Sequence, residues 1–128
     1  MKINHIALYC LDLEGMRQFF MTYFGCISNT LYHNLHTGLR TYILSFRDCS
    51  TRLEIMSRPE VIAINDDAYR SGYIHLSVSV GSKKAVDYKT KELVNAGYSC
   101  TNGPRTTGDG YYESCITGPE GILIEICV

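Results

Sequence analysis

Two segments of the chain, 3–10 and 73–80, alternate apolar residues with polar or aromatic ones. A period of two is typical of a half-buried strand. Each segment places one histidine, His5 or His75, on the face opposite its apolar run. His75 follows His5 by 70 residues. This spacing indicates an internal repeat.

A helix is predicted after each of these strands. Asp12 and Ser82 are suited to cap a helix N-terminus, and Gly25 and Gly97 to end one in a left-handed conformation. Apolar stripes at helical spacing lie between these signals: Leu13, Met16, Phe20, Tyr23 and Phe24 in the first copy, and Val86, Leu93 and Val94 in the second. We therefore expect helices over about 13–24 and 83–96.

Further strand-like runs follow each predicted helix, at 41–46, 52–56, 111–117 and 122–128. The last run of each copy carries one glutamate between apolar residues, Glu54 in the first and Glu125 in the second. By alternation, both carboxylates leave the apolar face of their strand. Each copy thus carries one histidine and one glutamate, 49 residues apart in the first and 50 in the second.

We interpret residues 1–128 as one domain of two repeated units, 1–57 and 72–128, joined by a linker at 58–71. In the linker, the residues Asn65-Asp66-Asp67 are typical of a turn, and the linker sequence is also compatible with a short helical turn. Three other segments are expected to lack regular structure: a polar loop at 28–38 with solvated His33 and His36, a loop at 103–112 on a pocket rim, and a tight turn at 118–121.

Composition narrows the classes of function. The formal net charge is −1 and the sequence pI is near 6.4, with no basic run among aromatics, so nucleic acid is not an expected partner. No apolar run approaches the ~18 residues of a membrane span, and no signal peptide opens the chain, so we expect a cytoplasmic protein without a membrane partner. The six cysteines show no metal-binding spacing and are expected to be reduced and mostly buried.

Taken singly, a histidine or glutamate on a strand is more often an ordinary packed or solvated residue than a ligand. The repeat of the pair in both units favours metal ligation, because four candidate ligands would come together if both units line one cavity: His5, Glu54, His75 and Glu125. Two imidazoles and two carboxylates suit Zn²⁺, Ni²⁺, Co²⁺, Mn²⁺ or Fe²⁺.

These features resemble the vicinal oxygen chelate superfamily, and within it the small glyoxalase I (lactoylglutathione lyase) enzymes. The resemblance lies in the four His and Glu positions, the two βαβββ-like halves and the closing Gly118-Pro119-Glu120-Gly121 turn before the last strand. It implies an α+β fold, in which two tandem βαβββ units form a curved mixed sheet around a metal-binding cavity. It also implies one divalent metal ion per site, with Ni²⁺ or Zn²⁺ favoured and Co²⁺ or Mn²⁺ as alternatives, and a homodimer.

The activity implied by this resemblance is isomerisation of a thiol hemithioacetal of a 2-oxoaldehyde, such as methylglyoxal, to a 2-hydroxyacyl thioester. A proton moves through a metal-stabilised enediolate. Carried over by position, Glu125 is the principal base and Glu54 its partner, and both are metal ligands together with His5 and His75. Extradiol dioxygenases of the superfamily use only one carboxylate, so Glu54 argues against that chemistry.

The chain departs from the family pattern where the thiol would bind. Many glutathione-using members have an arginine four residues after the first histidine, and this chain has Tyr9 there. Arg40, Arg47 or Arg105 would have to supply the cation, and Tyr111 and Tyr112 are further candidates for substrate contact. Two alternatives stay open: a non-catalytic small-molecule-binding protein, and another metal-dependent enzyme such as an epimerase.

Overall fold

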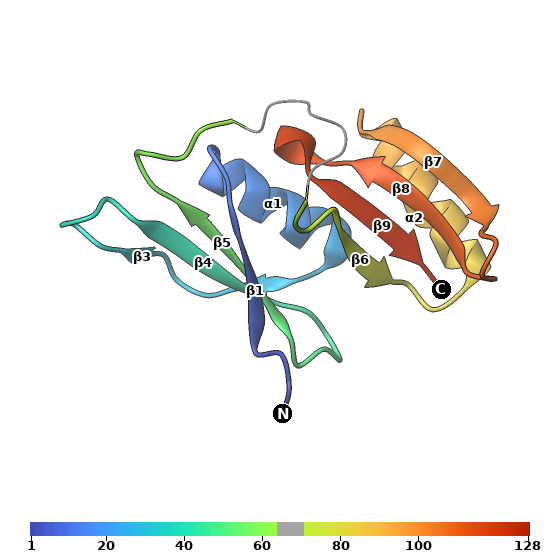
Figure 1. Cartoon of the computed structure of the whole chain (residues 1–128), viewed down its shortest axis with the longest axis horizontal. Helices are drawn as coiled ribbons and strands as arrows, with labels where there is room; N and C mark the ends of the chain where they lie inside the picture. Colours follow the sequence, from blue (N-terminus) through green and yellow to red (C-terminus); the bar gives the residue numbers. More distant parts are fainter. Residues whose placement is uncertain (64–70) are drawn as a thin grey trace. The chain divides into compact units, whose positions relative to one another are not determined.

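The computed structural model describes residues 1–63 and 71–128. The chain divides into two compact units, Met1–Ile64 and Asn65–Val128, and each is described by itself (Figure 1). The predicted turn at Asn65-Asp66-Asp67 and the helical turn in the linker lie outside the described residues. The assignment of 1–128 to one domain stays a prediction.

The first unit is a βαβββ arrangement whose second strand is split into two short pieces. Its elements are β1 (His5–Tyr9), α1 (Leu13–Phe24), β2 (Ile27–Ser28), β3 (Tyr32–His33), β4 (Arg40–Ser45) and β5 (Arg52–Ser57). The sheet order is β1-β5-β4-β2, and β3 also pairs with β4. β1 and β5 are parallel, and the other pairs are antiparallel.

The second unit repeats this topology. Its elements are β6 (His75–Ser79), α2 (Lys83–Asn95), β7 (Ser99–Thr106), β8 (Tyr112–Thr117), the 3₁₀ turn η1 (Pro119–Gly121) and β9 (Leu123–Cys127). The sheet order is β6-β9-β8-β7, again with one parallel pair, β6 with β9. The predicted α+β class of two βαβββ units is therefore confirmed.

In the first unit, α1 packs on the side of the sheet opposite His5 and Glu54. Asp12 caps the helix by accepting from the Gly15 amide at 2.9 Å, and Gly25 ends it with φ 61°. Both signals, and both ends of the helix, agree with the sequence prediction. The core includes Phe19, which the predicted stripe omits.

In the second unit, α2 packs against β7, β8 and β9, and it runs alongside β7 and β8 in Figure 1. Ser82 caps it by accepting from the Ala85 amide at 3.2 Å. The prediction that Val94 belongs to the buried stripe is wrong, because Val94 is 45% exposed. Thr90 is buried on the helix face that contacts the sheet, and its hydroxyl is hydrogen-bonded to the Ser114 hydroxyl on β8 at 2.6 Å.

Two of the predicted loops contain strands. The segment 28–38 includes β3 and the end of β2, although His33 and His36 are exposed as expected. Residues 103–106 belong to β7, so only the part of 103–112 after Thr106 connects strands. Backbone pairing to β4 and β8 overrides the turn chemistry of these sequences. The tight turn at 118–121 is confirmed by η1.

All six cysteines are free, as predicted. The expectation that most are buried is wrong, because only Cys10 and Cys26 are buried, Cys49 is exposed, and Cys100, Cys115 and Cys127 are half-buried. Cys115 and Cys127 have their side chains on the open face of the second sheet, which is the face turned away from α2. No helix among residues 1–63 and 71–128 is long and apolar enough to span a bilayer.

The packing of α2 leads to a direct test with two neighbouring residues. Leu93 is 0% exposed, whereas Val94 is 45% exposed. Leu93→Ala should lower the free energy of unfolding by about 2–5 kcal/mol, because it leaves a cavity against the sheet. Val94→Ala should change it by less than about 0.5 kcal/mol. Urea unfolding of both variants checks this, and equal losses would contradict the assigned helix face.

Candidate metal-binding and catalytic site

His5 and Glu54 meet on the open face of the first sheet. β1 and β5 are neighbouring parallel strands, and their register pairs Ala7 with Glu54. Alternation along β1 places His5 on the same face as Ala7. His5 Nε2 lies 3.5 Å from Glu54 Oε2, and the two side chains are 43% and 19% exposed.

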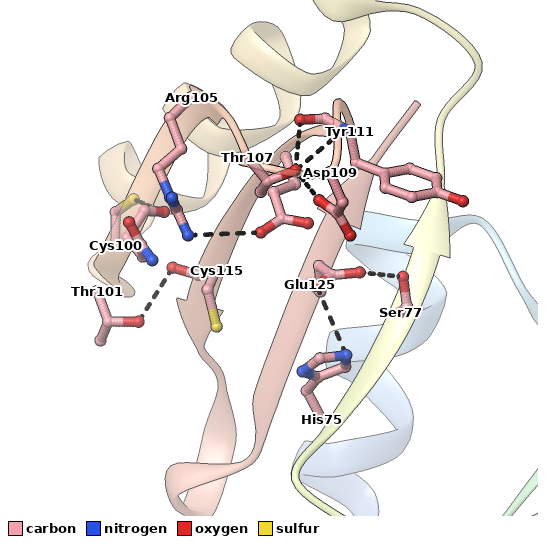
Figure 2. A network of polar contacts seen from close by, with 12 residues as sticks. His75, Ser77, Cys100, Thr101, Arg105, Thr107, Asp109, Tyr111, Cys115 and Glu125 are labelled. Atoms are coloured by element: carbon pink, nitrogen blue, oxygen red, sulfur yellow. Dashed lines mark hydrogen bonds and ion pairs between the residues drawn. The ribbon is translucent and has the colours of Figure 1, made fainter.

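His75 and Glu125 meet in the same way in the second unit. The register of β6 and β9 pairs Ser77 with Glu125, so the histidine again lies two residues before the partner of the glutamate. His75 Nε2 lies 3.5 Å from Glu125 Oε2, the same distance as in the first unit (Figure 2). The repeat inferred from sequence spacing is therefore also a repeat of strand register.

A hydroxyl group holds the other oxygen of each glutamate. Thr41 Oγ1 on β4 donates to Glu54 Oε1 at 3.0 Å. Ser77 Oγ on β6 donates to Glu125 Oε1 at 2.6 Å, as Figure 2 shows. In both units this leaves Oε2 facing the imidazole. Each hydroxyl restrains the orientation of its carboxylate, as the hydrogen-bond partners of metal ligands do.

The spacing within each pair fits a metal ion. Two ligand atoms about 2.1 Å from a tetrahedral ion lie about 3.4 Å apart, close to the 3.5 Å observed in both units. Among residues 1–63 and 71–128, however, no three His, Cys, Asp or Glu side chains are grouped to hold a metal ion. The ligand candidates come together as two pairs, and the convergence of all four stays a prediction.

Glu113 on β8 is a second acidic group beside Glu125. Burial raises the pKa of the Glu113 carboxyl, and the charge of Glu125 and a hydrogen bond between the two carboxyl groups raise it further, while Arg105 opposes the rise. Arg105 Nη2 on β7 lies 3.9 Å from Glu113 Oε1. Arg105, a predicted substrate-binding residue, thus lies on the same open face as Glu125, separated from it by β8.

Tyr9 lies at the end of β1 and is 53% exposed. Its side chain hydrogen-bonds to Arg58, a residue that sequence reasoning did not select. Arg58 Nε also donates to Glu60 at 2.7 Å, and these two partners raise the pKa of the guanidinium. The family position of Tyr9 therefore has a cation beside it after all, one that is already paired with a carboxylate.

The other predicted substrate residues are not gathered in one place. Tyr112 faces α2, and its hydroxyl donates to Asp87 at 2.7 Å, on the side of the sheet away from Glu125. This contact raises the pKa of Tyr112. Tyr111 is 60% exposed in the β7–β8 turn, where its amide donates to Thr107 Oγ1 (Figure 2). Arg40 precedes Thr41 on β4, on the face of α1, and Arg47 is exposed beyond the end of β4.

Thr41, Ser77 and Glu113 also belong to the site and were not selected from the sequence. Ser77 carried a usable signal, since it lies two residues after His75 and must share its face. Thr41 and Glu113 gave no such signal. Their contacts depend on the pairing of separate strands, which alternation within one strand does not reveal.

Comparisons with known proteins agree with this architecture. Residues 2–126 match the family described as the Glyoxalase/Bleomycin resistance protein/Dioxygenase superfamily. The chain is also 28% identical over 132 residues to the uncharacterized protein YqjT of Bacillus subtilis (strain 168), covering 97% of this chain and 96% of that protein.

Three solved structures share the fold at low sequence identity. The glyoxalase family protein from Enterococcus faecalis has a TM-score of 0.80 at 18% identity, covering 99% of this chain and 97% of that one. The trypanothione-dependent glyoxalase I of Leishmania major gives 0.79 at 16%, covering 99% and 86%. The antibiotic-binding protein TnmS3 from Streptomyces sp. CB03234 gives 0.73 at 16%, covering 99% and 94%. Both an enzyme and a binding protein are thus built on this fold.

The contact between Glu113 and Glu125 predicts a pH-dependent gain in stability for Glu113→Gln. The pKa of Glu113 is raised in the folded protein, so its ionisation opposes folding once the pH exceeds its ordinary carboxyl range. The glutamine amide keeps a donor to Glu125 and does not ionise. In metal-free protein, the variant should be more stable than wild type at about pH 7.5 and equal to it at about pH 4.

Urea unfolding of both proteins at the two pH values measures this difference. A stability difference that does not change with pH would contradict the predicted coupling of the two carboxyl groups.

Proposed function

Because the chain belongs to the Glyoxalase/Bleomycin resistance protein/Dioxygenase superfamily, we propose that it is a metal-dependent, glyoxalase I-like lyase. Its substrate would be the hemithioacetal of a 2-oxoaldehyde and a thiol, and its product a 2-hydroxyacyl thioester. The observation that carries this proposal is the His and Glu pair found at the same register and the same 3.5 Å distance in both units.

His5, Glu54, His75 and Glu125 would hold one divalent ion, with Ni²⁺ or Zn²⁺ favoured by the resemblance and Co²⁺ or Mn²⁺ as alternatives. When bound, the ion would stabilise the negative charge that develops on the substrate oxygens as the carbon-bound proton leaves. The two imidazoles would bind the ion as neutral ligands, because a ring nitrogen has a free lone pair only when it carries no proton.

Glu125 is the proposed base that takes the carbon-bound proton and returns it to the neighbouring carbon. Its support from Ser77 favours this role, because the hydroxyl would keep Oε1 in place while Oε2 leaves the ion to accept the proton. Glu54, held by Thr41 in the same manner, is its proposed partner on the other half of the site. One carboxylate in each unit would allow a proton to be moved on either side of the substrate.

Arg105 is the proposed contact for an acidic group of the thiol. At 3.9 Å its pairing with Glu113 is loose, and its side chain is 49% exposed on the open face of the second sheet. Tyr9 replaces the arginine found in many glutathione-using relatives, so the thiol need not be glutathione. The Leishmania major enzyme, with the same fold, is trypanothione-dependent, which supports a thiol other than glutathione as a candidate.

A second candidate function is binding of a small molecule without turnover. TnmS3 has this fold and is an antibiotic-binding protein, which supports small-molecule binding as a candidate function of this chain. An epimerase sharing the enediolate chemistry remains a third alternative. The homodimer and the cytoplasmic location stay predictions.

The role of Glu125 is tested by Glu125→Gln, which keeps the shape of the side chain and removes the base. The turnover number with methylglyoxal and a thiol, after loading with Ni²⁺ or Zn²⁺, should fall at least about 100-fold. Glu92→Gln on α2, where Glu92 pairs with Lys89, should leave turnover unchanged. Elemental analysis of both proteins gives the metal content.

About one metal ion per site, with turnover lost only in Glu125→Gln, would support the lyase. Metal binding without turnover of any thiol adduct would contradict the proposed substrate. Absence of metal under every loading condition would leave small-molecule binding as the function.

The role of Arg105 is tested by Arg105→Gln. For a thiol adduct that carries a carboxylate, KM should rise by about 10- to 100-fold while kcat stays nearly constant, since one charge-assisted contact is lost. Arg47→Gln, an exposed change in the first unit, is the control and should alter neither. For an uncharged thiol adduct the two variants should behave alike. A loss of kcat with constant KM would rule out the assigned role.

A further inference from the structure

The two histidines differ in what holds their second ring nitrogen. In the first unit, His5 Nδ1 lies 3.0 Å from Oδ1 of the preceding residue, Asn4. Among the described residues of the second unit, no hydrogen bond to His75 Nδ1 is present. The residue that precedes His75 is Ile74, which offers no side-chain acceptor.

Arg52 identifies the Asn4 atom in this contact as the amide oxygen. Arg52 Nη2 lies 2.5 Å from Asn4 Oδ1, and a guanidinium can only donate. The same oxygen must therefore accept from His5, so the ring carries its hydrogen on Nδ1. Its lone pair is then on Nε2, the nitrogen that faces Glu54 Oε2 at 3.5 Å.

The backbone keeps this contact in place. The Arg52 amide donates to the Asn4 carbonyl at 3.1 Å, and Thr51 Oγ1 donates to the Ile3 carbonyl at 3.1 Å. In the β1–β5 register Arg52 pairs with His5, and in the second unit the equivalent partner of His75 is Leu123. The polar pair Asn4 and Arg52 is thus replaced by the apolar pair Ile74 and Leu123.

We propose that Asn4 and Arg52 are positioning residues that lock His5 in the tautomer able to ligate a metal ion through Nε2, and that His75 lacks this lock. The proposal rests on the metal ligation by His5 in the proposed function. The two histidines then differ as ligands. His5 already has its free lone pair on Nε2, whereas His75 would adopt the ligating tautomer only when the ion binds. A ligand held in the correct tautomer binds with less reorganisation.

The first experiment measures the tautomer in metal-free protein. In protein labelled with ¹⁵N at histidine, the nitrogen shifts at neutral pH distinguish a ring protonated at Nδ1 from one protonated at Nε2, and His5→Gln assigns the His5 signals. Wild-type His5 should carry its proton on Nδ1. Asn4→Ile and Arg52→Leu, which copy the second unit, should shift His5 toward the Nε2-protonated form.

The second experiment measures Zn²⁺ affinity by competition with a chromogenic chelator. Asn4→Ile should weaken binding by about 10- to 100-fold, in the range found when the partner of a ligating histidine is lost. Asn4→Asp, which keeps an acceptor for both His5 and Arg52, should retain the wild-type tautomer and most of the affinity. Ile74→Ala, at the matching place in the second unit, should change neither property.

The second unit also allows a gain-of-function test. Ile74→Asn combined with Leu123→Arg should move His75 toward the Nδ1-protonated form and tighten Zn²⁺ binding. Wild-type His5 found mainly protonated on Nε2, or a tautomer unchanged by Asn4→Ile, would overturn the proposal. Because the tautomer is read without metal, a failure of the lyase assignment shows separately, as absent Zn²⁺ binding or absent turnover in wild type.

Discussion

The parallel pairing of the first and last strands within each unit is the constraint on which the candidate site depends. A helix follows the first strand in each unit and packs on one face of its sheet, so the last strand can run beside the first in the same direction. This pairing places a residue on the first strand of each unit beside one about 50 positions later. With the register observed, His5 reaches Glu54 and His75 reaches Glu125, each at 3.5 Å.

The two faces of each sheet carry different kinds of side chain. The helix side is apolar and closed, with Ile55 in the first unit and Ile124 in the second fully buried. The opposite side carries the histidines and glutamates, which remain partly exposed. The side chains of Glu54 and Glu125 are 19% and 20% exposed, and a hydroxyl orients each carboxylate.

The repeated geometry is supported by residues that are not repeated. Thr41 on β4 orients Glu54, whereas Ser77 on β6 orients Glu125. The β4 and β8 registers make Glu113 the counterpart of Thr41, so the second unit gains a carboxyl where the first has a hydroxyl. Around the two glutamates, the arrangement of histidine and glutamate is repeated, whereas the residue that supplies the hydroxyl is not. The proposed base, Glu125, therefore has a different neighbouring group from its proposed partner, Glu54.

Local signals in the sequence determined the helices and most strands. α1 begins after Asp12 and ends before Gly25, as predicted, because an N-cap and a left-handed glycine each act within one helical turn. Alternation along a strand, which is also a local property, placed both glutamates away from the apolar face. Alternation did not predict β7, because its segment through Asn102, Gly103 and Pro104 has no alternating pattern. Pairing with β8 holds this strand in place.

Sequence alone therefore determined which residue types each strand presents to its open face, because the period of a strand is a local property. It also revealed the repeat and hence the candidate ligands. Only the tertiary structure decided which of these side chains touch: Thr41 with Glu54, Glu113 with Glu125, and Arg52 with Asn4. Those contacts depend on the register of strands distant in sequence, and register is set by the packing of the whole sheet against its helix.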